Sequence, residues 1–242
     1  MSFLEHLEEL RKRLWWCVLA VGTAFALTLS YARRILDFFL VPVRPLLGAN
    51  RPVFLELTEP FMLYMKVAFL ASVFLAAPFI LYQVWAFISP GLYPRERRYA
   101  APFILFGTVF FLLGGAFGYL IGFPTACRFL LKVAEGFQPA LRISTLFGFE
   151  SKIILGLGLV FELPTLIAVL ARLGLVTAGF LWHYFQYAIL AIFIIAAVIT
   201  PTPDVVTQCV FAAPMILLYL VGILFARLFG RERQAPGEPD GT

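Results

Sequence analysis

Six apolar stretches, separated by clusters of charged residues, dominate the pattern along the chain. They cover residues 14–31, 67–88, 100–123, 153–171, 186–199 and 205–225. A helix rises about 1.5 Å per residue, and a bilayer has a hydrocarbon core of about 30 Å, so runs of about 20 apolar residues are typical of membrane spans. The pattern therefore predicts an all-α integral membrane protein with six transmembrane helices and both termini on one side.

The fifth stretch, 186–199, is short for a membrane span. At about 1.5 Å per residue it reaches roughly 21 Å, against a hydrocarbon core of about 30 Å. Either the bilayer thins beside it, or Trp182, Tyr184 and Phe185 extend the span into the interface. We therefore expect the fifth and sixth helices to be short.

Composition agrees with a membrane location. Apolar residues make up 62% of the 242 residues and charged residues 14%, whereas soluble domains carry about 25% charged residues. The mean hydropathy is +0.92. No linker interrupts residues 1–229, which we interpret as one membrane domain, and the polar residues 230–242 are expected to form a disordered cytoplasmic tail.

Charge gives a weaker signal about orientation and partners. With the termini inside, ten of the 19 basic residues face the cytoplasm, although short basic clusters directly precede the first and third spans. The net charge of +5 suits contact with anionic lipid, and no motif for nucleic-acid binding is present.

The three cysteines show no metal-binding spacing, so we expect free thiols, no metal site and no cofactor.

Two connections are longer than a simple turn requires. Residues 32–66 and 124–151 fall on the same side of the predicted membrane domain and contain the helix-like sequences ARRILDFFL and CRFLLKVAEGF. Several prolines and glycines interrupt the first of them. We expect the two segments to form a cap over the outer face.

One carboxylate lies inside a predicted span. Glu162 stands in LGLVFELPTL, about 15 Å from either end of its apolar stretch. An acid at that depth costs about 2.5 kcal/mol or more to insert, and such residues usually serve function. We expect its side chain to face the interior of the bundle, where Gly156 and Gly158 on about the same face would admit another helix.

Other carboxylates gather at the boundary with the cytoplasm. Glu5, Glu8 and Glu9 share the polar side of the first helix, and Glu96 follows the second span. They could simply be solvated, because Glu8 with Lys12 and Glu9 with Arg13 are spaced for ion pairs along a helix. They could also accept two guanidinium groups, which bind carboxylates through paired hydrogen bonds.

Five sequence blocks together resemble a known family. They are HLEELRKRL at 6–14, LYQVWAFISPGLYPRERR at 81–98, FGYLIGFP at 117–124, GLVFELP at 158–164 and TPTPDVVTQ at 200–208. In order and spacing they are similar to the TatC family, a subunit of the twin-arginine protein translocase. The resemblance implies a concave, glove-like bundle of six helices in a prokaryotic inner membrane, with both termini cytoplasmic.

The resemblance also implies a function without enzymatic activity. Members bind the twin-arginine signal peptides of folded precursor proteins, associate with one another and with the single-span TatA and TatB, and use the proton-motive force. Position by position, it places signal-peptide binding on Glu9, Glu96, Arg11, Arg97, Phe87, Leu92 and Tyr93. It identifies Glu162 as the intramembrane acid, and it places contacts with TatA or TatB at Thr200, Asp204 and Gln208.

Two other classes of function remain open from the residues alone. A small-solute or ion transporter would also explain Glu162, but it requires further polar groups in the membrane, and the first three spans offer few of them. An intramembrane enzyme fits less well, because the spans contain no HExxH sequence, no paired aspartates and no serine with a suitably placed base.

Overall fold

The computed structural model describes residues 3–47, 52–88, 100–137, 140–200 and 204–230. Within these ranges the chain is helical, and the one β-bridge joins Val53 to Arg142. The elements are α1 (Phe3–Leu29), α2 (Ala32–Leu40), α3 (Arg44–Leu47), α4 (Glu59–Ile88), α5 (Ala100–Phe117), the π-helix η3 (Gly118–Gly122), α6 (Phe123–Val133), α7 (Ile143–Phe161), α8 (Leu163–Arg172), α9 (Ala178–His183), α10 (Phe185–Ile199) and α11 (Val205–Phe229).

All six predicted apolar stretches are helical. Five helical segments of the described chain are long and apolar enough to cross a membrane, and two of them are composite, with α5, η3 and α6 in one and α7 and α8 in the other. The sixth, α10, has 15 residues and is short, as expected. The expectation of a short sixth helix does not hold, because α11 extends over 25 residues.

Besides α1, two helices begin well before their apolar stretches. α4 begins at Glu59 instead of residue 67, and α7 begins at Ile143 instead of residue 153. The reason is that charged residues near these helix starts are buried: Glu59, the first residue of α4, is 5% exposed, and Glu150, seven residues after the start of α7, is fully buried. Hydropathy along the chain treats such residues as loop, although packing encloses them.

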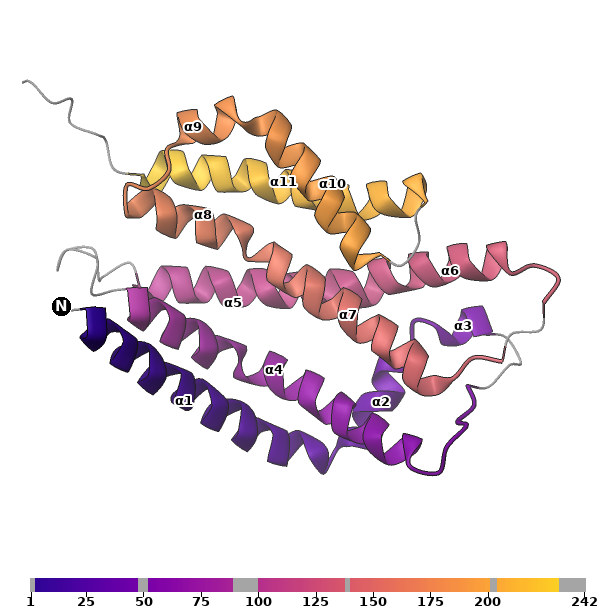
Figure 1. Cartoon of the computed structure of the whole chain (residues 1–242). Coiled ribbons are helices and arrows are strands. Elements are labelled where there is room, and N and C mark those ends of the chain that lie inside the picture. Colours follow the sequence, from indigo (N-terminus) through magenta and orange to yellow (C-terminus); the bar gives the residue numbers. More distant parts are fainter. Residues whose placement is uncertain (1–2, 48–51, 89–99, 138–139, 201–203, 231–242) are drawn as a thin grey trace, which may run out of the picture.

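The long helices lie side by side and run roughly along the same axis (Figure 1). α1 packs along α4, α5 packs against α7, and α8 packs against α11, which also contacts α10. The start of α1 and the end of α11 lie at one end of the bundle, while α2 and α3 lie at the other (Figure 1). This places the amino-terminal residues and the predicted cap at opposite ends.

The cap differs in part from its prediction. ARRILDFFL forms the separate helix α2, as expected. In contrast, CRFLLKV continues the third span as α6, since η3 connects α5 to α6 without a break in the helical path. The second cap segment is therefore short, from Ala134 to Arg142, and two of its residues, 138 and 139, lie outside the described ranges.

Glycines allow α5 and α7 to approach each other closely. A Cβ atom added to Gly114 would lie 2.5 Å from the backbone oxygen of Leu157, and one added to Gly118 would lie 3.0 Å from Cα of Ile154. Gly158, on α7, instead faces the ring of Phe111. The close backbone contact thus depends on Gly114 of α5 and Gly118 of η3. Other helices also lie close to Gly156 and Gly158, as expected, since Cβ atoms added there would lie 3.2 Å from Ile199 of α10 and 3.1 Å from Phe111 of α5.

The fourth span bends at its centre. α7 ends at Phe161 and α8 begins at Leu163, so Glu162 stands between two helices. Pro164, in the first turn of α8, has no N–H to donate to the preceding turn, which explains the interruption. The bend places the Glu162 side chain at a point where the helical pattern itself is broken.

Candidate functional site

An acidic groove lies between the amino-terminal part of α1 and α4. It has a volume of about 540 Å³. Its residues come from the part of the molecule where α1 starts and α4 ends (Figure 1). Its lining comprises Glu5, Glu8, Glu9, Lys12, Arg13, Trp16, Tyr82 and Gln83.

Glu9 is held in this groove by a chain of polar contacts. Arg13 donates from Nη2 to Glu9 Oε1 at 2.9 Å and from Nη1 to Gln83 Oε1 at 3.1 Å. The expected pair of Glu9 with Arg13 is therefore confirmed. Glu9 Oε2 accepts no hydrogen bond from the residues that the structure describes. One oxygen of the carboxylate thus stays available to an incoming donor.

Of the other residues predicted to bind the signal peptide, the structure describes only Arg11 and Phe87. Arg11 is exposed, and Arg13 rather than Arg11 contacts Glu9. Phe87, near the end of α4, stacks on the ring of His6 with centroids 4.4 Å apart. These contacts hold the first turns of α1 against the end of α4. The remaining members, Leu92, Tyr93, Glu96 and Arg97, lie outside the described residues.

Glu162 faces a small cavity between helices. The cavity has a volume of about 230 Å³. Thr165 is a polar neighbour in its lining, and a Cβ atom added to Gly107 of α5 would lie 3.1 Å from Glu162 Oε2. The acid therefore points into the bundle, as expected from its cost in lipid. The cavity is lined by Leu81, Val84, Trp85, Ile88, Phe103, Ile104, Glu162, Thr165, Leu166 and Val169.

The polar residues between α10 and α11 stabilise that connection. The Thr200 hydroxyl donates to the carbonyl of Ala196 at 2.8 Å, which caps the end of α10. Asp204 accepts from the N–H of Thr207 at 2.7 Å and caps α11. Gln208 donates to the carbonyl of Phe193 at 2.9 Å and links the two helices. These contacts position all three side chains predicted to meet a partner helix.

A charged cluster at the cap end escaped the sequence analysis. Arg142 donates to Glu59 at 2.9 Å and to Glu56 at 3.1 Å. The hydrogen bond to Glu59 raises the pKa of Arg142, so the guanidinium stays cationic. Next to it, Val53 exchanges backbone hydrogen bonds with the residues on either side of Arg142. No local motif announces this cluster, because its members come from two distant segments.

A second buried acid was also missed. Glu150, in α7, is fully buried, and neither carboxylate oxygen has a hydrogen-bond partner among the described residues. The sequence analysis assigned it to the loop 124–151. The signal that could have found it is its position between the apolar Phe147 and Ile153, which extends the helical periodicity of the fourth span backwards.

Comparison with known proteins gives a consistent result. Residues 5–214 match the family described as Sec-independent protein translocase protein (TatC). A protein of that name from Koribacter versatilis is 49% identical over 92% of this chain and 84% of its own length. Another, from Desulforapulum autotrophicum, is 40% identical over 98% of this chain and 88% of its own length.

Solved structures agree with the sequence comparison. The crystal structure of a twin arginine translocase receptor, TatC, superimposes with a TM-score of 0.78 at 33% identity and covers 92% of this chain and 98% of its own. A second crystal structure, of TatC in the detergent DDM, gives a TM-score of 0.79 at 32% identity, covering 92% of this chain and 99% of its own. The similarity thus includes the arrangement of the helices.

Proposed function

This chain belongs to the TatC family, whose members are non-enzymatic, multi-pass membrane components of the bacterial Sec-independent translocase, and we propose that it is the subunit that receives twin-arginine signal peptides. In this role Glu9 and Glu96 each accept one of the two arginines. The observation that carries the proposal is the position of Glu9, which lines an open acidic groove with one carboxylate oxygen available.

The contact between Arg13 and Glu9 supports this assignment. It demonstrates that a guanidinium fits against this carboxylate at 2.9 Å while the groove stays open. Arginine binds carboxylates with a planar, five-donor group, which suits recognition of arginine in preference to lysine. A second arginine of the signal peptide requires a second acid, and Glu96, in the segment between α4 and α5, is our candidate.

The aromatic end of the groove suits the residues that follow the arginines. Phe87 stacks on His6, and Trp16 and Tyr82 line the groove itself. Such rings bind apolar side chains and also the flat face of a guanidinium. We propose that Phe87 contacts the signal peptide, together with Leu92 and Tyr93, and that Arg97 helps to orient Glu96.

Substitution of single acids tests the proposal. Charge-assisted hydrogen bonds contribute about 1.5–3 kcal/mol, so Glu9→Gln is expected to weaken binding of a twin-arginine signal peptide about ten- to a hundredfold. Glu8→Gln is the matched control, since Glu8 lines the same groove without contacting Arg13. Affinity is measured by fluorescence anisotropy with purified protein in mild detergent. Equal affinities of both variants and the parent would refute the assignment.

We further propose that α10 and α11 bind the single-span subunits TatA and TatB. Asp204 and Gln208 stand at the turn of this helical hairpin, next to Thr200. The apolar side chains of Val198 and Val205 are 81% and 72% exposed. A hairpin that combines polar groups with exposed apolar surface suits a partner helix that carries a polar residue in an apolar span.

Photocrosslinking tests this second contact. A photoreactive amino acid at Val198 or Val205 should crosslink to TatA or TatB, whereas one at Leu19 of α1, which is 53% exposed on a distant helix, should not. Equal crosslinking from all three positions would exclude a specific site on the hairpin.

We also propose that both termini, and with them the acidic groove, face the cytoplasm, where signal peptides are first encountered.

A small-solute transporter receives no support from the cavity around Glu162. Apart from Glu162 and Thr165, the residues that line this cavity are apolar. A transport pathway requires several polar groups in succession across the membrane. The receptor role therefore agrees better with the side chains that the structure brings together.

A further inference from the structure

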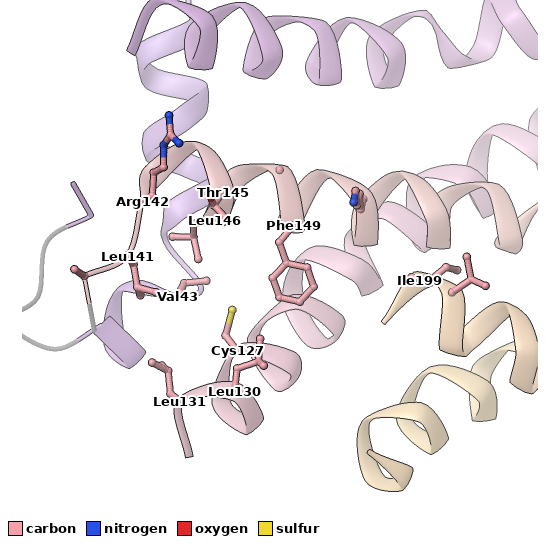
Figure 2. Close-up of a pocket in the computed structure, with 14 residues that line it drawn as sticks. Val43, Cys127, Leu130, Leu131, Leu141, Arg142, Thr145, Leu146, Phe149 and Ile199 are labelled. Atoms are coloured by element: carbon pink, nitrogen blue, oxygen red, sulfur yellow. The ribbon is translucent and has the colours of Figure 1, made fainter. Parts of the chain in front are cut away.

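A second cavity, separate from the acidic groove, lies at the cap end (Figure 2). It has a volume of about 830 Å³. Figure 2 shows that Val43, Leu130, Leu141 and Phe149 surround it, with Cys127 on one side and Ile199 of α10 on another. Its wall is therefore built from α6, α7, the end of α10 and the segments beside α3 and α7.

Lys152 is a charged residue in the largely apolar wall of this cavity. Thr145, Gly148, Phe149 and Lys152 follow one another at helical spacing, so one face of α7 lines the cavity. Lys152 is exposed, and it forms no ion pair or hydrogen bond with any described residue. It lies nine residues after the start of α7, about 14 Å along the helix. It also directly precedes the apolar stretch 153–171, where a lysine can extend its ammonium to the headgroup region of the bilayer.

The neighbouring cation differs from Lys152. Arg142 also lines the cavity, but Glu59 and Glu56 already bind its guanidinium. The described part of the wall contains no carboxylate that could neutralise Lys152. The cavity consequently combines an apolar interior with one unmatched positive charge, which is the chemistry that an anionic amphiphile recognises.

From this geometry we propose that the cavity binds an anionic phospholipid of the membrane, with an acyl chain in the apolar interior and the phosphate on Lys152. Access is available from the bilayer, since Leu130 and Val198, two of the lining residues, are 40% and 81% exposed. The bound chain covers the apolar walls of α6 and α7, and it connects them to the end of α10.

The size of the cavity favours an acyl chain over a protein partner. Its volume falls within the range of about 300–1,000 Å³ that is usual for small-ligand sites. An α-helix with its side chains is about 10–12 Å wide, so a volume of this size would hold only about two turns. A flexible chain can fill the space without the need to continue straight beyond it.

Native mass spectrometry provides the first test. The purified full-length protein in mild detergent is incubated with phosphatidylglycerol or with the zwitterionic phosphatidylcholine of the same chains. We expect the anionic lipid to be retained about ten- to a hundredfold more strongly, because one charge-assisted contact distinguishes the two. This comparison uses the unsubstituted chain and so does not depend on the folding of a variant.

Substitutions locate the site. Lys152→Gln should remove the preference for the anionic lipid, and Lys152→Arg should retain it. Lys66→Gln is the matched control, because Lys66 is an exposed lysine of α4 that lines a separate apolar cleft on the other side of α7. Loss of the preference in Lys66→Gln but not in Lys152→Gln would overturn the proposal.

Cys127 supplies a local reporter, since it lines the cavity and is 6% exposed. With Cys17 and Cys209 replaced by serine, a bound lipid should slow modification of Cys127 by a small neutral thiol reagent. Phosphatidylglycerol should protect it and phosphatidylcholine should not. Equal protection by both lipids, or protection that requires an added TatA or TatB helix in place of lipid, would contradict the assignment.

Discussion

Arg142 and Glu59 are separated by 83 positions in the sequence, yet the guanidinium Nε donates to the carboxylate at 2.9 Å. The same carboxylate accepts from the backbone N–H groups of Leu55 and Ser144. Its side chain is only 3% exposed. The pair thus joins the first residue of α4 to the residue before α7, and it connects the two parts of the cap.

Removal of this link should destabilise the protein. Arg142→Gln removes the cation that contacts the Glu59 carboxylate, whose side chain is 3% exposed. We expect a lower midpoint of thermal unfolding in detergent. Glu56→Gln is the control, because the Glu56 side chain is 66% exposed and solvent screens its pair with Arg142 more strongly. Equal midpoints for both variants would contradict this prediction.

The close contact between α5 and α7 yields a second prediction. A methyl group at Gly114 would lie 2.5 Å from the Leu157 oxygen and 2.8 Å from Phe161, so Gly114→Ala must separate the helices. Overpacking of this kind costs about 1–3 kcal/mol.

The control for this substitution is Gly148→Ala in α7. An added Cβ atom at Gly148 meets nothing within 4 Å. Alanine also favours a helix over glycine by up to about 1 kcal/mol, so Gly148→Ala should preserve or increase stability. Resistance to unfolding by SDS in mixed micelles measures both. If Gly114→Ala is as stable as the parent, the contact is looser than the structure indicates.

Substitution of Glu162 should impair export of a precursor without impairing the binding of its signal peptide. Glu162→Ala removes the acid from its cavity and leaves the distant groove around Glu9 intact, so we expect normal binding of a signal peptide but reduced export of a precursor. Glu162→Gln retains hydrogen bonding and should be milder. Export into inverted membrane vesicles and binding in detergent measure the two steps independently.

Gly107 offers an indirect route to the same carboxylate. A Cβ atom there lies 3.1 Å from Glu162 Oε2, so Gly107→Ala should displace the acid and reduce export. Gly22→Ala in α1, where an added Cβ atom meets nothing within 4 Å, should leave export unchanged. A Glu162→Ala variant that loses signal binding together with export would instead place Glu162 in the binding step.

Topology can be tested with single cysteines. In a chain with Cys17, Cys127 and Cys209 replaced, Arg95→Cys and Pro139→Cys should react with an impermeant maleimide from opposite sides of the membrane. The expectation follows from the positions of these residues between the second and third, and the third and fourth, apolar segments. Modification of both from the same side would exclude the six-span arrangement.

Features that depend on local pattern were predictable from the sequence. The apolar stretches located the spans, and the short stretch 186–199 predicted that α10 is short. The spacing of Glu9 and Arg13 predicted their ion pair. The inward orientation of Glu162 followed from the cost of an acid in lipid. In each case the energy that determines the feature acts within one helix or between a residue and its solvent.

Features that depend on the pairing of distant segments could not be predicted. The burial of Glu59 requires Arg142 from another part of the chain, and hydropathy alone therefore placed Glu59 in a loop. Close neighbours were expected at Gly156 and Gly158 of α7, but the contact between the backbones of the third and fourth spans at Gly114 of α5 and Gly118 of η3 was not predicted. Composition identifies small residues without specifying which helix lies opposite them.

The π-helix η3 accommodates one additional residue within the third span. The N–H of Phe123 bonds to the carbonyl of Gly118, five residues back, so this turn contains one more residue than an α-turn. Loss of a single residue here would let the turn form as an ordinary α-turn, and α6 would keep the orientation that places Phe123 and Cys127 in the core. A residue inserted elsewhere in the same span, where no wide turn accommodates it, would instead rotate the helix beyond it by about 100°. The wide turn is therefore the place in this span where the chain should best tolerate a change of length by one residue.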